Sequence, residues 1–266
     1  LIMSDIRSSL YIVGNLLVFF AIFMIIPLIY DYVNNGTDWI VFLTISSMCL
    51  FIGFNISFVF KNKKKDIGIL DAFVLTLLCW TILTLIGSIP FYIGSTNLSF
   101  IDAFFESMSG ITTTGATVIR DIDNTAESIL IWRAMLQWLG GIGIIVIAIA
   151  VFPVLKLGGM QLFKTEFSAR DDKVLPRTTT IAAGIGLVYL SLTLLCFVFL
   201  VMAGMDMFNG IAHAMTIVAT GGFSTKNMSI GHFDSLKIEV TTMCFMIISS
   251  LPFLLLFQSL KGKVSD

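Results

Sequence analysis

Two short polar segments interrupt a chain that otherwise consists largely of long apolar stretches. The first is SGITTTGATVI at residues 109–119, and the second is ATGGFST at residues 219–225. Glycine lets the backbone adopt φ values that aim successive carbonyls in one direction. Such carbonyls can replace the water shell of a cation, and this chemistry needs no catalytic side chain. Each segment is therefore either a surface loop or a backbone site for an ion.

The two segments belong to an internal repeat with an offset of 107 positions. At this offset the paired residues are Asp102 with Asn209, Glu106 with His213, Met108 with Met215, Thr113 with Thr220, Gly115 with Gly222 and Thr117 with Ser224. Tandem copies in the same orientation imply symmetry about an axis along the membrane normal. We therefore expect the two polar segments to converge on that axis.

Glu106 and His213 occupy matching places just before the two polar segments. A carboxylate buried in a membrane is costly and usually functional. We expect Glu106 to brace the first segment through hydrogen bonds to backbone amides, and direct attraction of a cation is the alternative. We expect His213 to be a hydrogen-bonded packing residue, and a proton-linked role is its alternative.

The composition places these segments in a membrane protein. Hydrophobic residues make up 57% of the chain and charged residues 12%, with a mean hydropathy of +0.96. A soluble chain carries about 25% charged residues. The four cysteines lie inside apolar stretches without paired spacing, which is typical of small hydrophobic residues and not of disulfides or metal ligands.

Six apolar stretches are long enough to cross the hydrocarbon core. They cover about 9–30, 38–60, 68–93, 129–154, 178–204 and 235–260. The apolar stretch at about 100–111 is too short to span, and MFNGIAHAMTIVATGGFST at 207–225 has the same form. Irregular backbone at membrane depth is tolerated only where it is buried in protein or lines a watery cavity. We therefore expect these two stretches to begin re-entrant loops.

The predicted fold is an all-α integral membrane protein. Two leading transmembrane helices are followed by two helix–re-entrant pore loop–helix repeats. The predicted divisions are an N-terminal helix pair at 1–66, a first repeat at 67–155, a cytoplasmic linker at 156–177 and a second repeat at 178–266.

Basic residues gather on one side of the alternating spans. They are Arg7, Lys61, Lys63, Lys64, Lys65, Lys156, Lys164, Arg170, Lys173, Arg177, Lys261 and Lys263. Because cytoplasmic loops carry an excess of Lys and Arg, this side is predicted to be cytoplasmic, with both termini inside. Arg133 and Lys237 lie near span ends, and we expect their side chains to extend outward along the helix to the interface.

Long motifs resemble the Trk/Ktr/HKT superfamily of potassium transporters, and most closely its Trk-type membrane subunits. They are DAFFESMSGITTTGAT at 102–117, the stretch from WRAMLQWLGG at 132 to LGGMQLF at 163, LPR at 175–177 and HAMTIVATGGFSTKNMSI at 213–230. The resemblance spans nearly the whole chain. It implies potassium uptake, with K⁺ as the transported ion and no cofactor, so we do not expect an enzyme.

The resemblance also implies which residues meet the ion. Thr113, Thr114, Gly115 and Ala116 would form one strand of a selectivity filter, and Thr220, Gly221, Gly222 and Phe223 would form a second. Potassium would bind to their backbone carbonyls. Because serine at the filter glycine goes with sodium transport in relatives, Gly115 and Gly222 favour potassium.

The resemblance further implies partners and a location. We expect a homodimer that binds a cytoplasmic nucleotide-binding regulatory subunit and membrane lipids, and that binds no nucleic acid. The expected location is the inner membrane of a bacterial cell.

The sequence departs from the family in one respect, because it carries two repeats where the family carries four. We expect it to be the N-terminal half of a longer chain, and assembly of two copies is the alternative. Two other functions stay open. One is a non-transporting remnant or assembly partner, and the other is an intramembrane hydrolase that would use Ser109 and His213.

Overall fold

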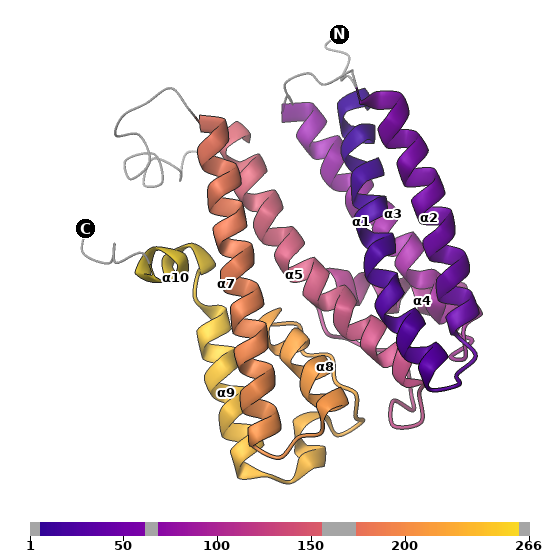
Figure 1. The fold of residues 1–266 in the computed structure, drawn as a ribbon, viewed down its shortest axis with the longest axis vertical. Helices are drawn as coiled ribbons and strands as arrows, with labels where there is room; N and C mark the ends of the chain where they lie inside the picture. The colour runs from indigo at the N-terminus through magenta and orange to yellow at the C-terminus, as the bar shows by residue number, and fades with distance from the viewer. Residues whose placement is uncertain (1–5, 62–68, 156–173, 261–266) are drawn as a thin grey trace.

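The computed structural model describes residues 6–61, 69–155 and 174–260, and these residues form helices without a strand (Figure 1). The helices are α1 (Ile6–Val33), α2 (Trp39–Phe60), α3 (Ile69–Ile93), α4 (Phe100–Ile111), α5 (Glu127–Leu155), α7 (Val174–Met202), α8 (Met207–Val218), the 3₁₀ helix η2 (Ser229–Phe233), α9 (Leu236–Ser250) and α10 (Phe253–Leu260). The predicted linker at 156–177 and the lysines at 63–65 lie largely outside the described residues.

Four of the described helices are long and apolar enough to cross a membrane. The qualifying stretches are Arg7–Val33 in α1, Trp39–Phe60 in α2, Phe73–Ile93 in α3 and Ala182–Met202 in α7. The short helices α4 and α8 have 12 residues each, less than the length needed to span. The all-α membrane class predicted from the sequence is confirmed.

Helix α5 lies between two groups of helices (Figure 1). On one side, α1, α2, α3 and α4 pack around it, and on the other side α7 and α8 contact it. The first group has a core centred on Trp132 of α5, whose ring meets the edges of the Phe20 and Phe42 rings at centroid distances of 5.2 and 6.0 Å. Trp132 Nε1 also donates to the Gly87 carbonyl at 3.0 Å. This arrangement fixes α5 against α3, and α5 in turn carries the side chains that hold the site.

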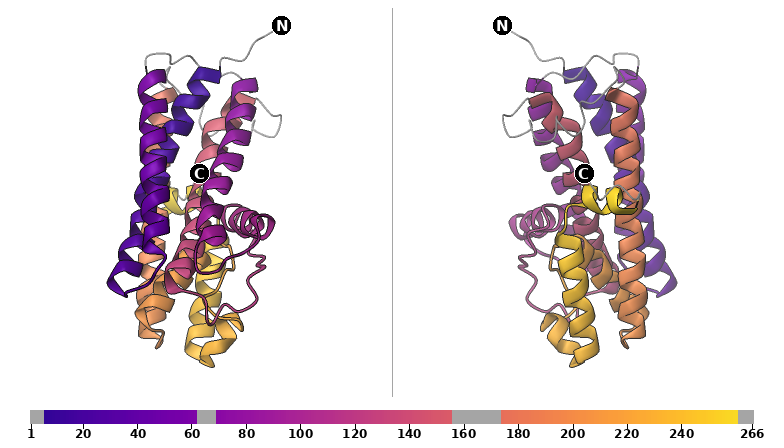
Figure 2. Two further views of the ribbon diagram at one scale, coloured as in Figure 1. Left: turned by 90° about the vertical axis from the view of Figure 1, so that its right-hand side faces the viewer. Right: turned by 90° about the vertical axis from the view of Figure 1, so that its left-hand side faces the viewer.

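The prediction of one continuous final span at 235–260 is wrong. Helix α9 ends at Ser250, Leu251 is extended with ψ 145°, and α10 starts at Phe253. Pro252 explains the break, because proline disfavours the helical conformation of the preceding residue and offers no N–H of its own. Figure 2 shows that α10 runs across the direction of α9.

Candidate cation site

The two short helices that lead into the polar segments start in the same way. Ser99 accepts from Asp102 N at 3.2 Å to cap α4, and Asp206 accepts from Asn209 N at 3.1 Å to cap α8. Burial would raise the pKa of the Asp206 carboxyl, but hydrogen bonds from Asn209 and from the backbone of Asp206 and Phe208 together hold the pKa below its ordinary value. Each cap satisfies a backbone donor of the first helical turn.

The helices also end in the same way. Thr113 and Thr220 have φ of 56° and 52°, and Gly115 and Gly222 have φ of 79° and 84°. In both copies, the residue after the threonine donates its N–H to the carbonyl five positions earlier, from Thr114 to Ser109 and from Gly221 to Thr216, at 2.9 Å each. The repeat inferred from the sequence is therefore present in the backbone, residue for residue, at the same offset.

The two polar segments meet at their glycines. A Cβ atom added to Gly115 would overlap the Gly221 carbonyl oxygen, so the two backbones touch there without room for a side chain. A Cβ atom at Gly222 would meet nothing within 4 Å. Thr114, Ala116 and Thr220 are likewise exposed. The two segments thus join along one edge and leave carbonyl-bearing backbone open on the other.

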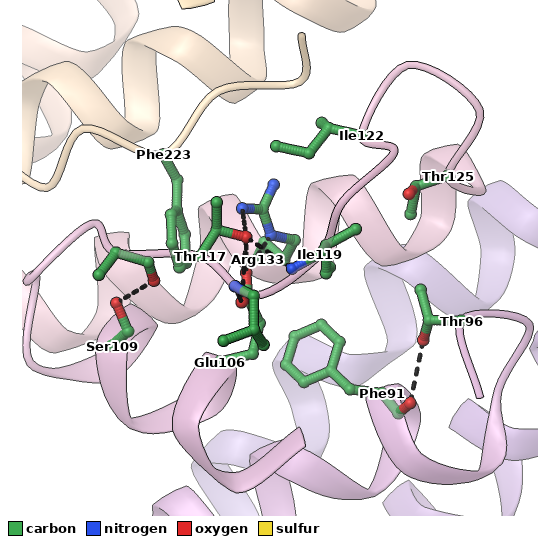
Figure 3. A network of polar contacts seen from close by, with 12 residues as sticks. Phe91, Thr96, Glu106, Ser109, Thr117, Ile119, Ile122, Thr125, Arg133 and Phe223 are labelled. Atoms are coloured by element: carbon green, nitrogen blue, oxygen red, sulfur yellow. Dashed lines mark hydrogen bonds and ion pairs between the residues drawn. The ribbon is translucent and has the colours of Figure 1, made fainter. Parts of the chain in front are cut away.

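Glu106 holds the first segment from beneath (Figure 3). Its carboxylate is fully buried and accepts from Val118 N at 2.9 Å and from Thr117 Oγ1 at 2.9 and 3.1 Å. The hydrogen bond to Val118 N is of the bracing kind expected from the sequence. A carboxylate with these partners fixes the backbone just beyond Ala116.

Arg133 of α5 pairs with Glu106 and reaches the second segment as well. Arg133 Nε lies 2.7 Å from Glu106 Oε1, and the two side chains are 1% and 0% exposed. Arg133 Nη1 donates to the Ser224 carbonyl at 2.9 Å, and the guanidinium lies 4.2 Å from the centre of the Phe223 ring. Figure 3 shows Arg133 between Glu106 and Phe223.

The expectation that Arg133 would extend outward to the membrane interface is therefore wrong. Its position near a span end allowed that interpretation, but Glu106 supplies a buried counter-charge in the packed fold. A buried charge is tolerated when it is paired and hydrogen-bonded. Lys237 lies in the first turn of α9 and is exposed.

His213 takes the place of Glu106 in the second copy and forms neutral contacts. Its Nδ1 lies 2.8 Å from the Asn209 carbonyl, and its Nε2 lies 2.9 Å from Ser224 Oγ. Ser224 is the counterpart of Thr117, so the link between short helix and segment is kept while its charge is lost. This agrees with the packing interpretation of His213.

Gln137 is a site residue that the sequence interpretation missed. It lies one helical turn after Arg133 on α5, is fully buried, and accepts from Phe223 N at 3.1 Å through Oε1. The spacing of four residues, which places both polar side chains on one face of an otherwise apolar helix, is the signal that could have found it.

A second pair of contacts joins the far ends of the segments. Asn227 Oδ1 accepts from Ile122 N at 3.0 Å, and Asn227 Nδ2 donates to Asp123 Oδ2 at 2.8 Å. We call Asn227 and Asp123 the clasp. Together with Arg133, the clasp links the first repeat to the second.

Ser109 and His213 do not form a catalytic pair in the described structure. Ser109 Oγ donates to the Ala116 carbonyl at 2.5 Å, whereas His213 Nε2 bonds to Ser224. Among the described residues, no group of three or more His, Cys, Asp or Glu side chains is placed to hold a metal ion.

An open hollow of about 420 Å³ lies beside the segments. Thr113 and Thr220, the first residues of the two predicted filter strands, line it together with Tyr189, Ser249 and Leu251. The break between α9 and α10 thus faces the first residue of each predicted strand.

The fold and the site together define the class, an α-helical membrane protein of tandem repeats whose polar backbone segments meet. The sequence matches the family described as "TrkH: Cation transport protein" over residues 39–263. The chain therefore belongs to the TrkH family.

Individual relatives agree with this assignment. The chain is 42% identical over 256 residues to the Trk system potassium uptake protein TrkH of Vibrio parahaemolyticus, which covers 95% of this chain and 53% of the relative. It is 39% identical over 260 residues to the protein of that name in Escherichia coli K12, covering 97% of this chain and 54% of the relative. The chain thus spans about half the length of the curated relatives it matches.

A solved structure is similar as well. The crystal structure of the potassium transporter TrkH from Vibrio parahaemolyticus superposes with a TM-score of 0.84 at 39% sequence identity. The similarity covers 97% of this chain and 52% of that chain.

Proposed function

We propose that the chain contributes to a path for potassium ions across the membrane. The observation that carries this proposal is the pair of matching backbones, in which Thr113 and Thr220, and Gly115 and Gly222, share the left-handed conformation. The relatives are potassium uptake proteins by name, which supports the choice of ion.

In this proposal, K⁺ binds to main-chain carbonyls of Thr113, Thr114, Gly115 and Ala116 in the first segment and of Thr220, Gly221, Gly222 and Phe223 in the second. These carbonyls replace the ion's hydration shell. Helices α4 and α8 enter the membrane as re-entrant halves, and their partly negative C-terminal ends favour a cation. Because the Ala116 carbonyl already accepts from Ser109, the carbonyls nearer the glycines carry most of the coordination.

Two segments contact an ion from one side only, since Gly222 and Thr220 face open space in this chain. Further segments of the same kind, supplied by additional polypeptide, complete the ring in our proposal. Relatives about twice as long as the matched region support this arrangement.

The wider setting follows from the sequence and belongs to the same proposal. The protein lies in the inner membrane of a bacterial cell with its basic side and both termini in the cytoplasm. It forms a homodimer, contacts membrane lipids and binds a cytoplasmic nucleotide-binding regulatory subunit. Coordination by carbonyls requires no cofactor and no enzymatic step.

The test is potassium-limited growth and ⁸⁶Rb⁺ or K⁺ uptake in a bacterial host that lacks its own uptake systems. The chain is expressed alone and joined to the complementary half of the Vibrio parahaemolyticus relative. We expect Gly115→Ser and Gly222→Ser to lower the preference for K⁺ over Na⁺ in the active form. Gly231→Ser is the control, because a Cβ at Gly231 meets nothing within 4 Å and its φ is not left-handed.

Uptake that is unaffected by both filter substitutions would show that the ion path lies elsewhere. Normal folding without flux in either form would favour the non-transporting remnant or assembly partner. Serine-probe labelling that depends on Ser109 would favour the hydrolase instead.

A further inference from the structure

The side-chain amide of Gln137 bonds to the second polar segment and lies close to the first. On the second segment, Oε1 accepts from Phe223 N at 3.1 Å, and a Cβ added to Gly221 would overlap the same amide. On the first, a Cβ added to Gly115 would lie 3.7 Å from Nε2. The amide plane therefore lies at the point where the two backbones touch.

The other half of this amide has no partner. Gln137 is 0% exposed, and its Nε2 is a buried donor without a hydrogen bond among the described residues. A buried donor left unsatisfied costs about 1–3 kcal/mol. Buried polar groups in folded proteins are nearly always hydrogen-bonded, so this donor calls for an explanation.

The polar side chain one helical turn before Gln137 has hydrogen-bond partners of its own. Arg133, one turn earlier, bonds to Glu106, Thr117 and Ser224. The donor on Gln137 thus lies next to the backbone that the first segment offers for ion binding, where acceptor oxygens are the complementary chemistry.

We propose that Gln137 is the positioning residue that sets the spacing of the two filter segments, and hence their selectivity among alkali cations. Oε1 anchors the second segment at Phe223, and Nε2 donates to an acceptor oxygen of the first segment at Gly115, directly or through one water molecule. This role rests on the proposed function and adds to it a side chain from α5 that never touches the ion.

The experiment compares substitutions that remove different parts of the amide in the transport-active form of the chain. Gln137→Met keeps about the length of the side chain and removes both the acceptor that holds Phe223 N and the Nε2 donor. Gln137→Glu keeps an acceptor for Phe223 N and removes the donor. We expect Gln137→Met to reduce the K⁺-over-Na⁺ uptake ratio about fivefold, the size of one net hydrogen bond. We expect Gln137→Glu to reduce it as well.

Ser107→Ala is the matched control. Ser107 is also fully buried and donates to a backbone carbonyl, that of Thr84, at 2.8 Å, but it contacts α3 and neither filter segment. Removing this hydrogen bond tests whether the loss of any buried hydrogen bond lowers the K⁺-over-Na⁺ uptake ratio. Protein amount and the thermal unfolding midpoint in detergent are measured for each variant.

Unchanged selectivity in Gln137→Met, or a change no larger than in Ser107→Ala, would overturn the proposal. Unchanged selectivity in Gln137→Glu alone would overturn the role of the donor. If the unsubstituted chain shows no K⁺ uptake, alone or joined to the complementary half, the result would instead count against the proposed function. The two failures are therefore distinguishable.

A double-substitution cycle keeps the proposal testable if Gln137→Met does not fold. Gly221→Ala places a methyl group into the amide of Gln137, and the φ of Gly221 is not left-handed, so the collision is the main effect. We expect Gly221→Ala to lower the selectivity ratio and Gln137→Ala to recover part of the loss by making room. Strictly additive effects would contradict a shared role.

Discussion

Arg133 Nη1 donates to the backbone carbonyl of Ser224 at 2.9 Å, so a side chain of the first repeat holds the main chain of the second. The same guanidinium is neutralised by Glu106. Its hydrogen bonds to Thr117 and Ser224 make α5 a shared support for the two segments, through one planar, forked group.

Glu106→Ala is expected to destabilise the protein by about 3–5 kcal/mol, because it leaves the Arg133 charge buried without a partner. The measurement is the thermal unfolding midpoint in detergent, with exposed Arg120→Ala as the control. The double variant Glu106→Ala with Arg133→Met should lose less than Glu106→Ala alone. If the unfolding midpoint of the double variant is lower than that of either single variant, the unpaired Arg133 charge is not the cause of the loss in Glu106→Ala.

Gly115→Ala and Gly222→Ala are expected to differ although both residues have a similar positive φ. The left-handed conformation costs each alanine about 1–2 kcal/mol. Only Gly115→Ala also meets a neighbouring backbone, the Gly221 carbonyl. The unfolding midpoint should therefore fall further for Gly115→Ala, and equal losses would mean that the two segments do not touch.

The spans and the paired segments could be predicted because hydropathy and a fixed offset are properties of the linear sequence. The offset of 107 even gave matching positions for Thr113 with Thr220 and for Gly115 with Gly222, which share their backbone geometry. The break at Pro252 could not be predicted from hydropathy, because the apolar stretch that contains it has the length of a single span.

Asn227→Ala is expected to open the clasp. It removes the acceptor for Ile122 N and the contact with Asp123, a loss of about 1 kcal/mol. Amide hydrogen exchange at Ile122 should accelerate by about fivefold. Lys226→Ala is the matched control, since Lys226 lies 4.0 Å from Asp123 at a partly exposed site and such pairs contribute little. If hydrogen exchange at Ile122 accelerated equally in Asn227→Ala and Lys226→Ala, the effect would come from the charge near Asp123 and not from the hydrogen bonds of Asn227.

Pro252→Ala is expected to let α9 continue toward α10. Spin labels at the exposed residues Ile247 and Leu255 report the change, in a background without cysteine. Eight residues of continuous helix span about 12 Å, and the label separation should approach that value. An unchanged separation would show that packing of Phe253 on Tyr189, with ring centroids 5.5 Å apart, maintains the break by itself.

The contacts of Arg133 and Gln137 could not be read from the sequence, because they depend on how the two repeats pack. Arg133 near the start of a span is compatible with an interfacial position until Glu106 is placed beside it. The sequence around Gln137 does not indicate that its side chain accepts a hydrogen bond from the backbone N–H of Phe223. The ion-binding roles of the eight filter residues stay predictions.

The order of the residues along the chain has a consequence for biogenesis. Glu106 is synthesised before Arg133, and both precede Ser224. An arginine entering the bilayer is costly when it is unpaired. Here the counter-charge is already available when α5 leaves the ribosome, so Glu106 and Arg133 can enter the bilayer as a neutral pair. The second repeat, made later, then docks its main chain at Ser224 onto a guanidinium that is already in place.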